Sequence, residues 1–241
     1  ALDAIGVRNF SKYHRLLQHL TSTEFAWDRR SADDRLVIFS ERLESLRWLK
    51  ERLSQDLKLK EGEVEILDGQ MPDTEQQSIV EAFGQQASPL RVLLCSDVAS
   101  EGLNLHYFCH RLIHFDLPWS LMVFQQRNGR VDRYGQKNRP EIVYLFTKTE
   151  VEKIKGDLRI LEILQQKDDQ AQKNLGDPGV FLNLYDPARE AEAVSDYMAS
   201  GVDADQLSEE LDKRAAEEVE GEGDWIMEMF QSQTEAPEPA N

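Results

Sequence analysis

Gln125-Gln-Arg-Asn-Gly-Arg-Val-Asp-Arg-Tyr-Gly-Gln136 is the most informative stretch of this sequence. Its arginines, Arg127, Arg130 and Arg133, recur at every third residue, so on a helix they would share one side. Guanidiniums this close repel one another unless an anion lies between them, and their planar, permanently charged forks suit phosphate. Gly129 lets a ligand or another segment approach closely. The stretch predicts a phosphate-binding segment, and the alternative is a solvated basic helix face.

A second polar segment, Leu94-Cys-Ser-Asp-Val-Ala-Ser-Glu-Gly-Leu-Asn-Leu105, follows an apolar run. Its small side chains and Gly102 leave room for a sugar and a phosphate, and Asp97, Glu101 and Asn104 can each accept a hydrogen bond from a hydroxyl. The segment predicts nucleotide contacts at the end of a buried strand. The alternative is a polar turn that caps a helix.

Short apolar runs and helical repeats alternate through the first 149 residues. Strands are predicted at 36–39, 64–67, 91–95, 111–115 and 142–146, and helices at 10–21, 41–55, 72–83 and 119–128. This order predicts an α/β fold, a largely parallel sheet with helices on both faces. Ligands of such folds lie beyond the carboxyl ends of the strands, which here means 40–41, 68–70, 96–104 and 116–120.

Charge divides the chain into two parts. The 241 residues carry a net charge of −17, and residues 150–241 hold 24 of the 45 acidic side chains but only 8 of the 28 basic ones. We therefore expect separate units at 1–149 and 150–241, the second an acidic, mainly helical extension with a disordered end. An acidic segment repels nucleic acid, so any nucleic-acid contact is expected in residues 1–149.

Two cysteines exclude a disulfide scaffold, and no apolar run approaches the length of a membrane span. A cytoplasmic location is expected. The chain begins at Ala1 without an initiator Met, which suggests a piece of a longer protein.

Together, the two quoted segments resemble motifs V and VI of the second RecA-like domain of superfamily-two helicases and translocases. The closer resemblance is to the Swi/Snf-like branch and its bacterial members similar to the RNA-polymerase-associated ATPase, because residues 130–136 match R-x-x-R-x-G-Q. Three further segments match in order: Val37-Ile-Phe-Ser40 (motif IV), Leu67-Asp-Gly69 (motif IVa) and Phe115-Asp-Leu-Pro-Trp119 (the D-x-P-W segment). The resemblance covers about residues 10–149.

The resemblance implies a role for each matching residue. Arg130 and Arg133 would be arginine fingers that reach the γ-phosphate of ATP from across an interdomain cleft, and Arg127 would serve local packing. Gly102, Asn104 and Gln126 would contact the nucleotide. Residues in contact with the nucleic-acid backbone would be Ser40, Gly69 and Ser96, and Trp119 would link this side to the ATP side.

The resemblance also implies partners. ATP and Mg²⁺ would be bound mainly by a first RecA-like domain of the same protein, and double-stranded DNA would be the expected track. RNA polymerase or another protein would be a candidate partner of the acidic extension.

Two departures and two absences qualify the resemblance. Ser120-Leu121 stands where the family usually has Asn-Pro, and Gln76-Gln77 replaces a basic residue of motif IVa. No G-x-x-x-x-G-K-[ST] phosphate loop and no acidic Mg²⁺ box are found. We therefore predict that this chain alone does not hydrolyse ATP appreciably.

Other interpretations rest on weaker patterns. His106, Cys109, His110 and His114 lie close in sequence but lack the paired spacing of structural zinc sites, so no metal is expected. Cys95 and Cys109 are expected to be core residues. The rival function is a non-catalytic, acidic protein-interaction module on a RecA-like scaffold, and a dinucleotide enzyme is disfavoured because no G-x-G-x-x-G occurs.

Overall fold

The computed structural model describes residues 10–97, 105–147, 157 and 160–161. All of them belong to the first of the chain's two compact units, Ala1–Leu161. The predicted acidic extension lies almost entirely outside the described residues, so its helices and the boundary at 149/150 stay predictions.

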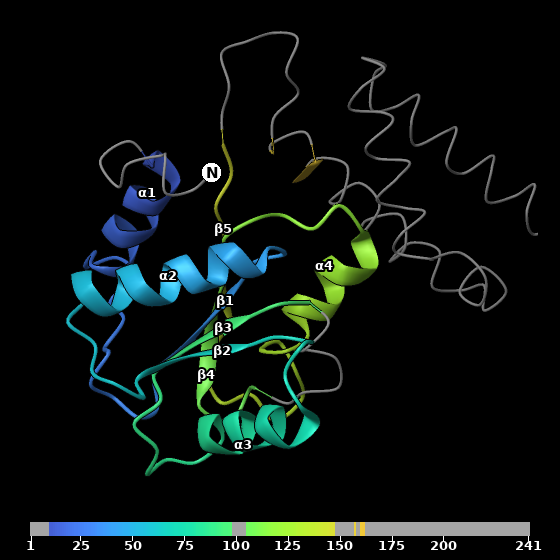
Figure 1. Cartoon of the computed structure of the whole chain (residues 1–241). Coiled ribbons are helices and arrows are strands. Elements are labelled where there is room, and N and C mark those ends of the chain that lie inside the picture. The colour runs from blue at the N-terminus through green and yellow to red at the C-terminus, as the bar shows by residue number, and fades with distance from the viewer. Residues whose placement is uncertain (1–9, 98–104, 148–156, 158–159, 162–241) are drawn as a thin grey trace, which may run out of the picture. The chain divides into compact units, whose positions relative to one another are not determined.

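A five-stranded parallel sheet forms the centre of this unit (Figure 1). In spatial order its strands are β2 (Val64–Leu67), β3 (Val92–Cys95), β1 (Arg35–Phe39), β4 (Cys109–His114) and β5 (Glu141–Tyr144). Every neighbouring pair is parallel, which confirms the predicted RecA-like α/β sheet. β1 is central and buried along its whole length, which explains why it is an uninterrupted apolar run after Arg35.

Helices cover both faces of the sheet. Figure 1 shows α1 (Ser11–Leu20) and α2 (Leu43–Asp56) on one face and α3 (Asp73–Phe83) on the other, and α4 (Leu121–Asn128) follows β4. The predicted strands and helices lie within about two residues of the observed ones. Among the described residues, none of the helices is long and apolar enough to cross a bilayer.

Two apolar layers hold the helices to the sheet. One layer joins α1 and α2 to the strands and includes Leu16, Leu49 and Ile38. The other joins α3 to the opposite face through Phe83, Val37 and Leu93, and it also contains Val131, which follows α4. Because alternate residues of a strand point to opposite faces, Val37 and Ile38 of β1 serve different layers.

At the amino edge of the sheet, Arg35 is fully buried and closes the end of α3. Its guanidinium donates to the carbonyl oxygens of Ala82 (3.1 Å), Phe83 and Gln85 (2.5 Å). The last carbonyls of a helix have no partner within the helix and carry partial negative charge, so a cation satisfies them. Burial lowers the pKa of Arg35. This arginine therefore serves as a cap for α3.

Candidate functional site

The carboxyl ends of the strands bring the predicted polar segments to one edge of the sheet. Ser40 follows β1, Gly69 follows β2, Ser96 follows β3 and Trp119 follows β4. The ladder continues past the strands, since Ser40 N–H donates to the Cys95 carbonyl and Ser96 N–H to the Leu67 carbonyl, at 3.1 and 3.0 Å. The segments after β1, β2 and β3 are therefore held side by side, as predicted for a ligand site.

Arg127 is the central side chain of this edge, and it is 1% exposed. Its Nε and Nη2 donate to the two carboxylate oxygens of Asp97, at 2.5 and 2.8 Å. Nη1 donates to the Asp116 carbonyl at 2.9 Å, and Nη2 lies 3.6 Å from the Asp116 carboxylate. The guanidinium also lies 5.4 Å from the centre of the Phe39 ring. One side chain of α4 thus ties together the segments that follow β3 and β4.

Only the first of the three arginines lies on the helix, so the shared side expected for three arginines on one helix does not apply to them. α4 ends at Asn128, and Gly129 is its C-cap, so Arg130 and Arg133 lie beyond the helix. Arg127 is buried in carboxylate pairs, Arg130 is half-buried and Arg133 is exposed. Helical spacing does not apply after a helix has ended. The packing role that the resemblance implied for Arg127 agrees with its burial.

The loop 129–136, which carries Arg130 and Arg133, is attached at both ends. At its start, Arg130 N–H donates to the Arg127 carbonyl at 3.1 Å, and two further N–H groups of the loop donate to the Asn128 carbonyl. At its far end, the Gln136 side-chain amide donates to the carbonyls of Cys109 (2.9 Å) and Val131 (3.0 Å). These contacts hold two arginines at the surface on a short, fixed segment.

Ser40 and Asp116 form a second junction. Ser40 is fully buried, and its hydroxyl donates to Asp116 at 2.5 Å, while the Glu41 N–H donates to the same carboxylate at 3.0 Å. The Ser40 hydroxyl is thus buried and donates to Asp116, and its predicted contact with a nucleic-acid backbone stays a prediction. Ser40 connects the end of β1 to the segment that holds Arg127.

The other residues predicted to contact a nucleic-acid backbone differ in their exposure to solvent. Gly69 is exposed in the turn after β2, and the Trp119 side chain is 37% exposed just before α4. Ser96 is half-buried as a residue, but its hydroxyl oxygen is itself buried and has no hydrogen-bond partner among the described residues. Gln126 is half-buried on α4, whereas Gly102 and Asn104 lie outside the described residues.

The histidine and cysteine cluster considered in the sequence is dispersed. Cys109 donates from its thiol to the Arg111 carbonyl at 3.2 Å, and His114 stacks among aromatic rings on the sheet. Burial raises the pKa of Cys109 to about 12 and raises that of Cys95 as well, so both are buried thiols. Across the described part of the chain, no three His, Cys, Asp or Glu side chains gather in a way that could hold a metal ion.

Sequence reasoning missed the partners of Arg127. Asp97 was interpreted as an acceptor for a nucleotide hydroxyl, but its carboxylate holds a guanidinium 30 residues away. Asp116 was quoted only as part of the D-x-P-W segment. The available signal was an aspartate two residues beyond the end of β3 and another two residues beyond the end of β4, the strands on either side of β1.

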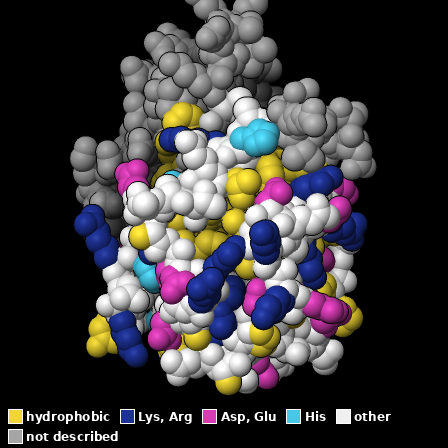
Figure 2. All heavy atoms as spheres, turned by 90° about the vertical axis from the view of Figure 1, so that its left-hand side faces the viewer, with side chains coloured by type: hydrophobic (Ala, Val, Ile, Leu, Met, Phe, Trp, Pro, Cys, Tyr) yellow, Lys and Arg dark blue, Asp and Glu magenta, His cyan; other side chains and the backbone are white. Residues whose placement is uncertain are grey.

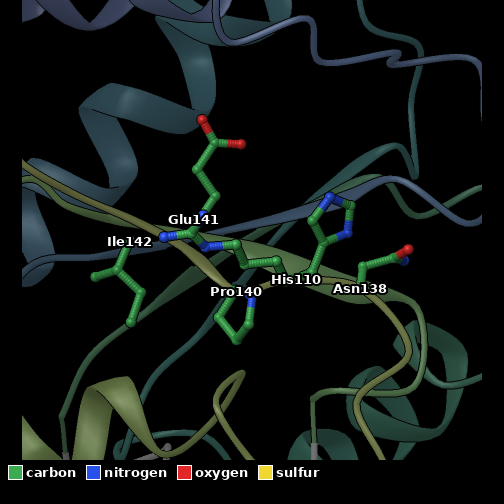
Figure 3. A pocket seen from close by; sticks show the side chains of 6 residues that line it. His110, Asn138, Pro140, Glu141 and Ile142 are labelled. Carbon is green, nitrogen blue, oxygen red and sulfur yellow. The ribbon is translucent and has the colours of Figure 1, made fainter.

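The amino edge differs in character. A hollow of about 530 Å³ lies there, lined by His110, Asn138, Arg139, Pro140, Glu141 and Ile142. Figure 3 shows the Glu141 side chain pointing the opposite way from Pro140 and Ile142, as alternation in a strand requires. The Glu141 carboxylate accepts from Arg111, which also donates to Asp34 at 2.6 Å. The charged groups behind this hollow therefore already pair with one another.

Basic and acidic side chains are mixed on the face that Figure 2 turns toward the viewer. A polyanion binds most strongly where positive charges gather without interspersed carboxylates. The mixture of signs on this face is typical of a solvated surface.

Comparison with known proteins places the chain among helicase domains. The family model "Helicase conserved C-terminal domain" matches residues 11–135. The chain is 36% identical over 88 residues to "Uncharacterized ATP-dependent helicase YqhH" of Bacillus subtilis (strain 168), a match that covers 36% of this chain and 15% of that protein. It is 37% identical over 87 residues to "RNA polymerase-associated protein RapA" of Vibrio cholerae, covering 36% of this chain and 9% of the relative. The matches thus span less than a sixth of these relatives.

Solved structures share the fold. The C-terminal part of the Fun30 ATPase domain matches with a TM-score of 0.51 and 23% identity, over 63% of this chain and 44% of that one. Domain 2 of the DEAD-box helicase Mss116p, bound to an RNA duplex, matches with a TM-score of 0.51 and 18% identity, over 66% and 56%. At this level of identity the likeness concerns the fold alone.

Proposed function

Since this chain belongs to the family of helicase conserved C-terminal domains, we propose that it is the second motor half of an ATP-driven nucleic-acid translocase. In this proposal the carboxyl edge of the sheet faces a first RecA-like domain of the same protein, which holds ATP. Closing and opening of the two halves moves the protein along double-stranded DNA.

The observation that carries the proposal is the fixed loop 129–136. It leaves α4 at Arg127 and Asn128 with Arg130 half-buried, carries the exposed Arg133, and ends where the Gln136 amide donates to the carbonyl of Cys109, the first residue of β4. Arg127 itself is withdrawn into carboxylate pairs. Arginines held in this way on a rigid segment suit a triphosphate presented by a neighbouring domain, because they stabilise charge that develops in the transition state. Arg130 and Arg133 are therefore the proposed arginine fingers.

The donor set fits ATP phosphates better than a resident Mg²⁺. The guanidiniums of Arg130 and Arg133 donate hydrogen bonds to phosphate oxygens, whereas Mg²⁺ prefers carboxylate and water oxygens. Asp97 and Asp116 already hold Arg127. Mg²⁺ would accordingly be held with ATP by the first domain, and Gln126, Gly102 and Asn104 are proposed to contact the nucleotide.

Nucleic acid is proposed to lie along Gly69, Ser96 and Trp119. These residues follow three different strands, and their backbone N–H, hydroxyl and indole groups can position a phosphate backbone without reading its sequence. Ser40 acts behind them through Asp116.

The relative RapA is named as RNA polymerase-associated, so RNA polymerase is the proposed protein partner of the acidic residues 150–241 in the cytoplasm.

Arginine substitutions in the intact protein, which joins this chain to its phosphate-binding domain, test the function. Arg130→Ala and Arg133→Ala are each expected to lower DNA-stimulated ATPase turnover by roughly a thousandfold. Arg139→Ala, which replaces an exposed arginine at the amino edge, is the matched control. ATPase activity that survives both finger variants would favour the non-catalytic interaction module.

Three further measurements separate the parts of the proposal. Hydrolysis by this chain alone should stay at background, and robust turnover would contradict the division of labour between two domains. Stimulation by duplex DNA should exceed that by duplex RNA. Removal of residues 162–241 should weaken binding to RNA polymerase without changing DNA-stimulated turnover.

A further inference from the structure

His114 is a buried imidazole between the sheet and α4. It is the last residue of β4, is 0% exposed and lies in a stack of rings from Phe39, Phe124 and Tyr144, with centroids 6.3, 5.7 and 4.8 Å away. An apolar ring would fill the same space. What distinguishes histidine from an apolar ring at this position is therefore the pair of contacts that its two ring nitrogens make.

Both nitrogens of His114 contact residues of α4. Nδ1 lies 3.4 Å from Nη1 of Arg127, and Nε2 lies 2.9 Å from Oδ1 of Asn128. A guanidinium can only donate, so Nδ1 must accept and Nε2–H must donate to Asn128. Burial, and next the neighbouring Arg127, lower the pKa of His114 to about 3, so the ring is neutral, as this pattern requires.

The two residues that His114 holds are those from which the arginine loop departs. The Arg127 carbonyl accepts from Arg130 N–H at 3.1 Å, and the Asn128 carbonyl accepts from Val131 and Asp132 N–H groups at 3.1 and 3.0 Å. The Asn128 amide in turn donates to the Tyr144 hydroxyl of β5 at 3.2 Å. The direction in which the chain leaves α4 thus depends on how the ends of β4 and β5 hold residues 127 and 128.

We propose that His114 is a positioning residue for Arg130. By bridging Arg127 and Asn128, its neutral imidazole sets the exit direction of the loop 129–136 and hence the place of the Arg130 guanidinium. The inference rests on the proposed function, in which Arg130 meets the γ-phosphate. A transition-state contact is sensitive to such positioning, because a displacement of about 1 Å can cost up to a hundredfold in rate.

The test uses His114→Phe in the intact protein, because phenylalanine keeps the ring stack and removes both polar contacts. We expect kcat of the DNA-stimulated ATPase to fall about tenfold, while KM for ATP changes less than about twofold. His114→Gln, whose amide can both accept and donate, should recover most of the lost kcat. His19→Phe, a substitution of the same kind in α1, is the control and should leave turnover unchanged.

The second variant, Asn128→Ala, keeps the test valid should His114→Phe fail to fold. It removes the acceptor for Nε2–H at a half-buried position and should lower kcat several-fold. The inference is overturned where His114→Phe folds and turns over within about twofold of the parent. It is also overturned where the Gln and Phe variants lose kcat equally, or where Asn128→Ala is silent while His114→Phe does not fold.

Arg130→Ala, measured in parallel, separates this inference from the proposed function. A silent Arg130→Ala overturns both. A large loss for Arg130→Ala together with an unchanged His114→Phe overturns only the role of His114.

Discussion

Arg35 and Arg127 are equally buried, at 0% and 1% exposure, but they lie at opposite edges of the sheet and bind different kinds of partner. Among the described residues, the Arg35 side chain donates to backbone carbonyls: three at the end of α3 and, from Nε, that of Ala32 at 3.0 Å. Arg127 donates to Asp97 and Asp116, which belong to segments after two different strands. A cap on one helix stabilises a single element, whereas a junction of carboxylates fixes the relative places of several loops. The difference indicates that the amino edge serves the fold and the carboxyl edge serves the site.

Arg127→Ala should have the larger effect of the two. It leaves two neighbouring carboxylates without their cation and removes the contact with Phe39, so we expect the free energy of unfolding to fall by about 3 kcal/mol. ATPase turnover of the intact protein should be lost even where the variant is folded. Urea denaturation measures the first effect and steady-state turnover at a temperature well below the melting point the second. A folded Arg127→Ala variant with normal turnover would contradict the conclusion that the carboxyl edge serves the site.

Arg35→Ala should destabilise without inactivating. The variant leaves carbonyls of α3 without a donor, which costs about 2 kcal/mol. Turnover per folded molecule of the intact protein should equal that of the parent, because no described residue of the carboxyl edge contacts this guanidinium. The same two assays apply, and a loss of turnover like that of Arg127→Ala would show that the edges are not distinct.

Acid should weaken the carboxyl edge through His114. The native pKa of about 3 lies below the ordinary 6.5, so the unfolded chain binds more protons between these values. Stability is therefore full above pH 6.5 and declines as pH falls, by at most about 1.4 kcal/mol per pH unit from this group. Urea denaturation at pH 7.5, 6 and 5 measures the slope.

His114→Phe is the control for the acid effect, because it removes the titrating group. Burial also lowers the pKa of His110 at the amino edge, so this variant should flatten the slope without abolishing it. If the dependence of stability on pH were the same in the variant as in the parent, His114 would bind protons equally in the folded and the unfolded protein, and its native pKa would not be lowered.

The smallest effect is expected for the ion pair between Lys50 and Glu65. Its N–O distance is 2.7 Å, but the side chains are 40% and 34% exposed. Water and salt screen such pairs, so Glu65→Gln should change the free energy of unfolding by about 0.5 kcal/mol or less. A larger change would mean that the contribution of a charged contact to the free energy of unfolding depends on its N–O distance rather than on its burial.

The fold was predictable because its three inner strands, β3, β1 and β4, are buried on both faces. The run Leu36 to Phe39 is apolar at every position, and regular helical repeats such as Leu46, Leu49 and Leu53 follow it. These patterns depend on local sequence alone, so the order of strands and helices and their approximate ends could be predicted.

The interior of the candidate site was not predictable in the same way. Pairing of Asp97 with Arg127 or of Ser40 with Asp116 joins residues 30 and 76 positions apart, and no local period records such contacts. Gly129 does carry a local signal, since glycine often ends a helix, and the helix predicted at 119–128 ends at the observed residue, Asn128. The predicted roles of Arg130, Arg133, Gln126, Gly69, Ser96 and Trp119 stay predictions.

The pairing of Asp97 with Arg127 has a consequence for how this sequence can diverge. Loss of the aspartate first would leave a cation that is 1% exposed with the Asp116 carboxylate, 3.6 Å away, as its nearest carboxylate among the described residues. The two aspartates keep 27% and 29% of their side-chain surface in contact with solvent, so water can hydrate them if the arginine goes first. Positions 97 and 127 are therefore expected to covary among related chains, and the arginine is expected to be the first of the two to be replaced in any lineage that abandons the pair.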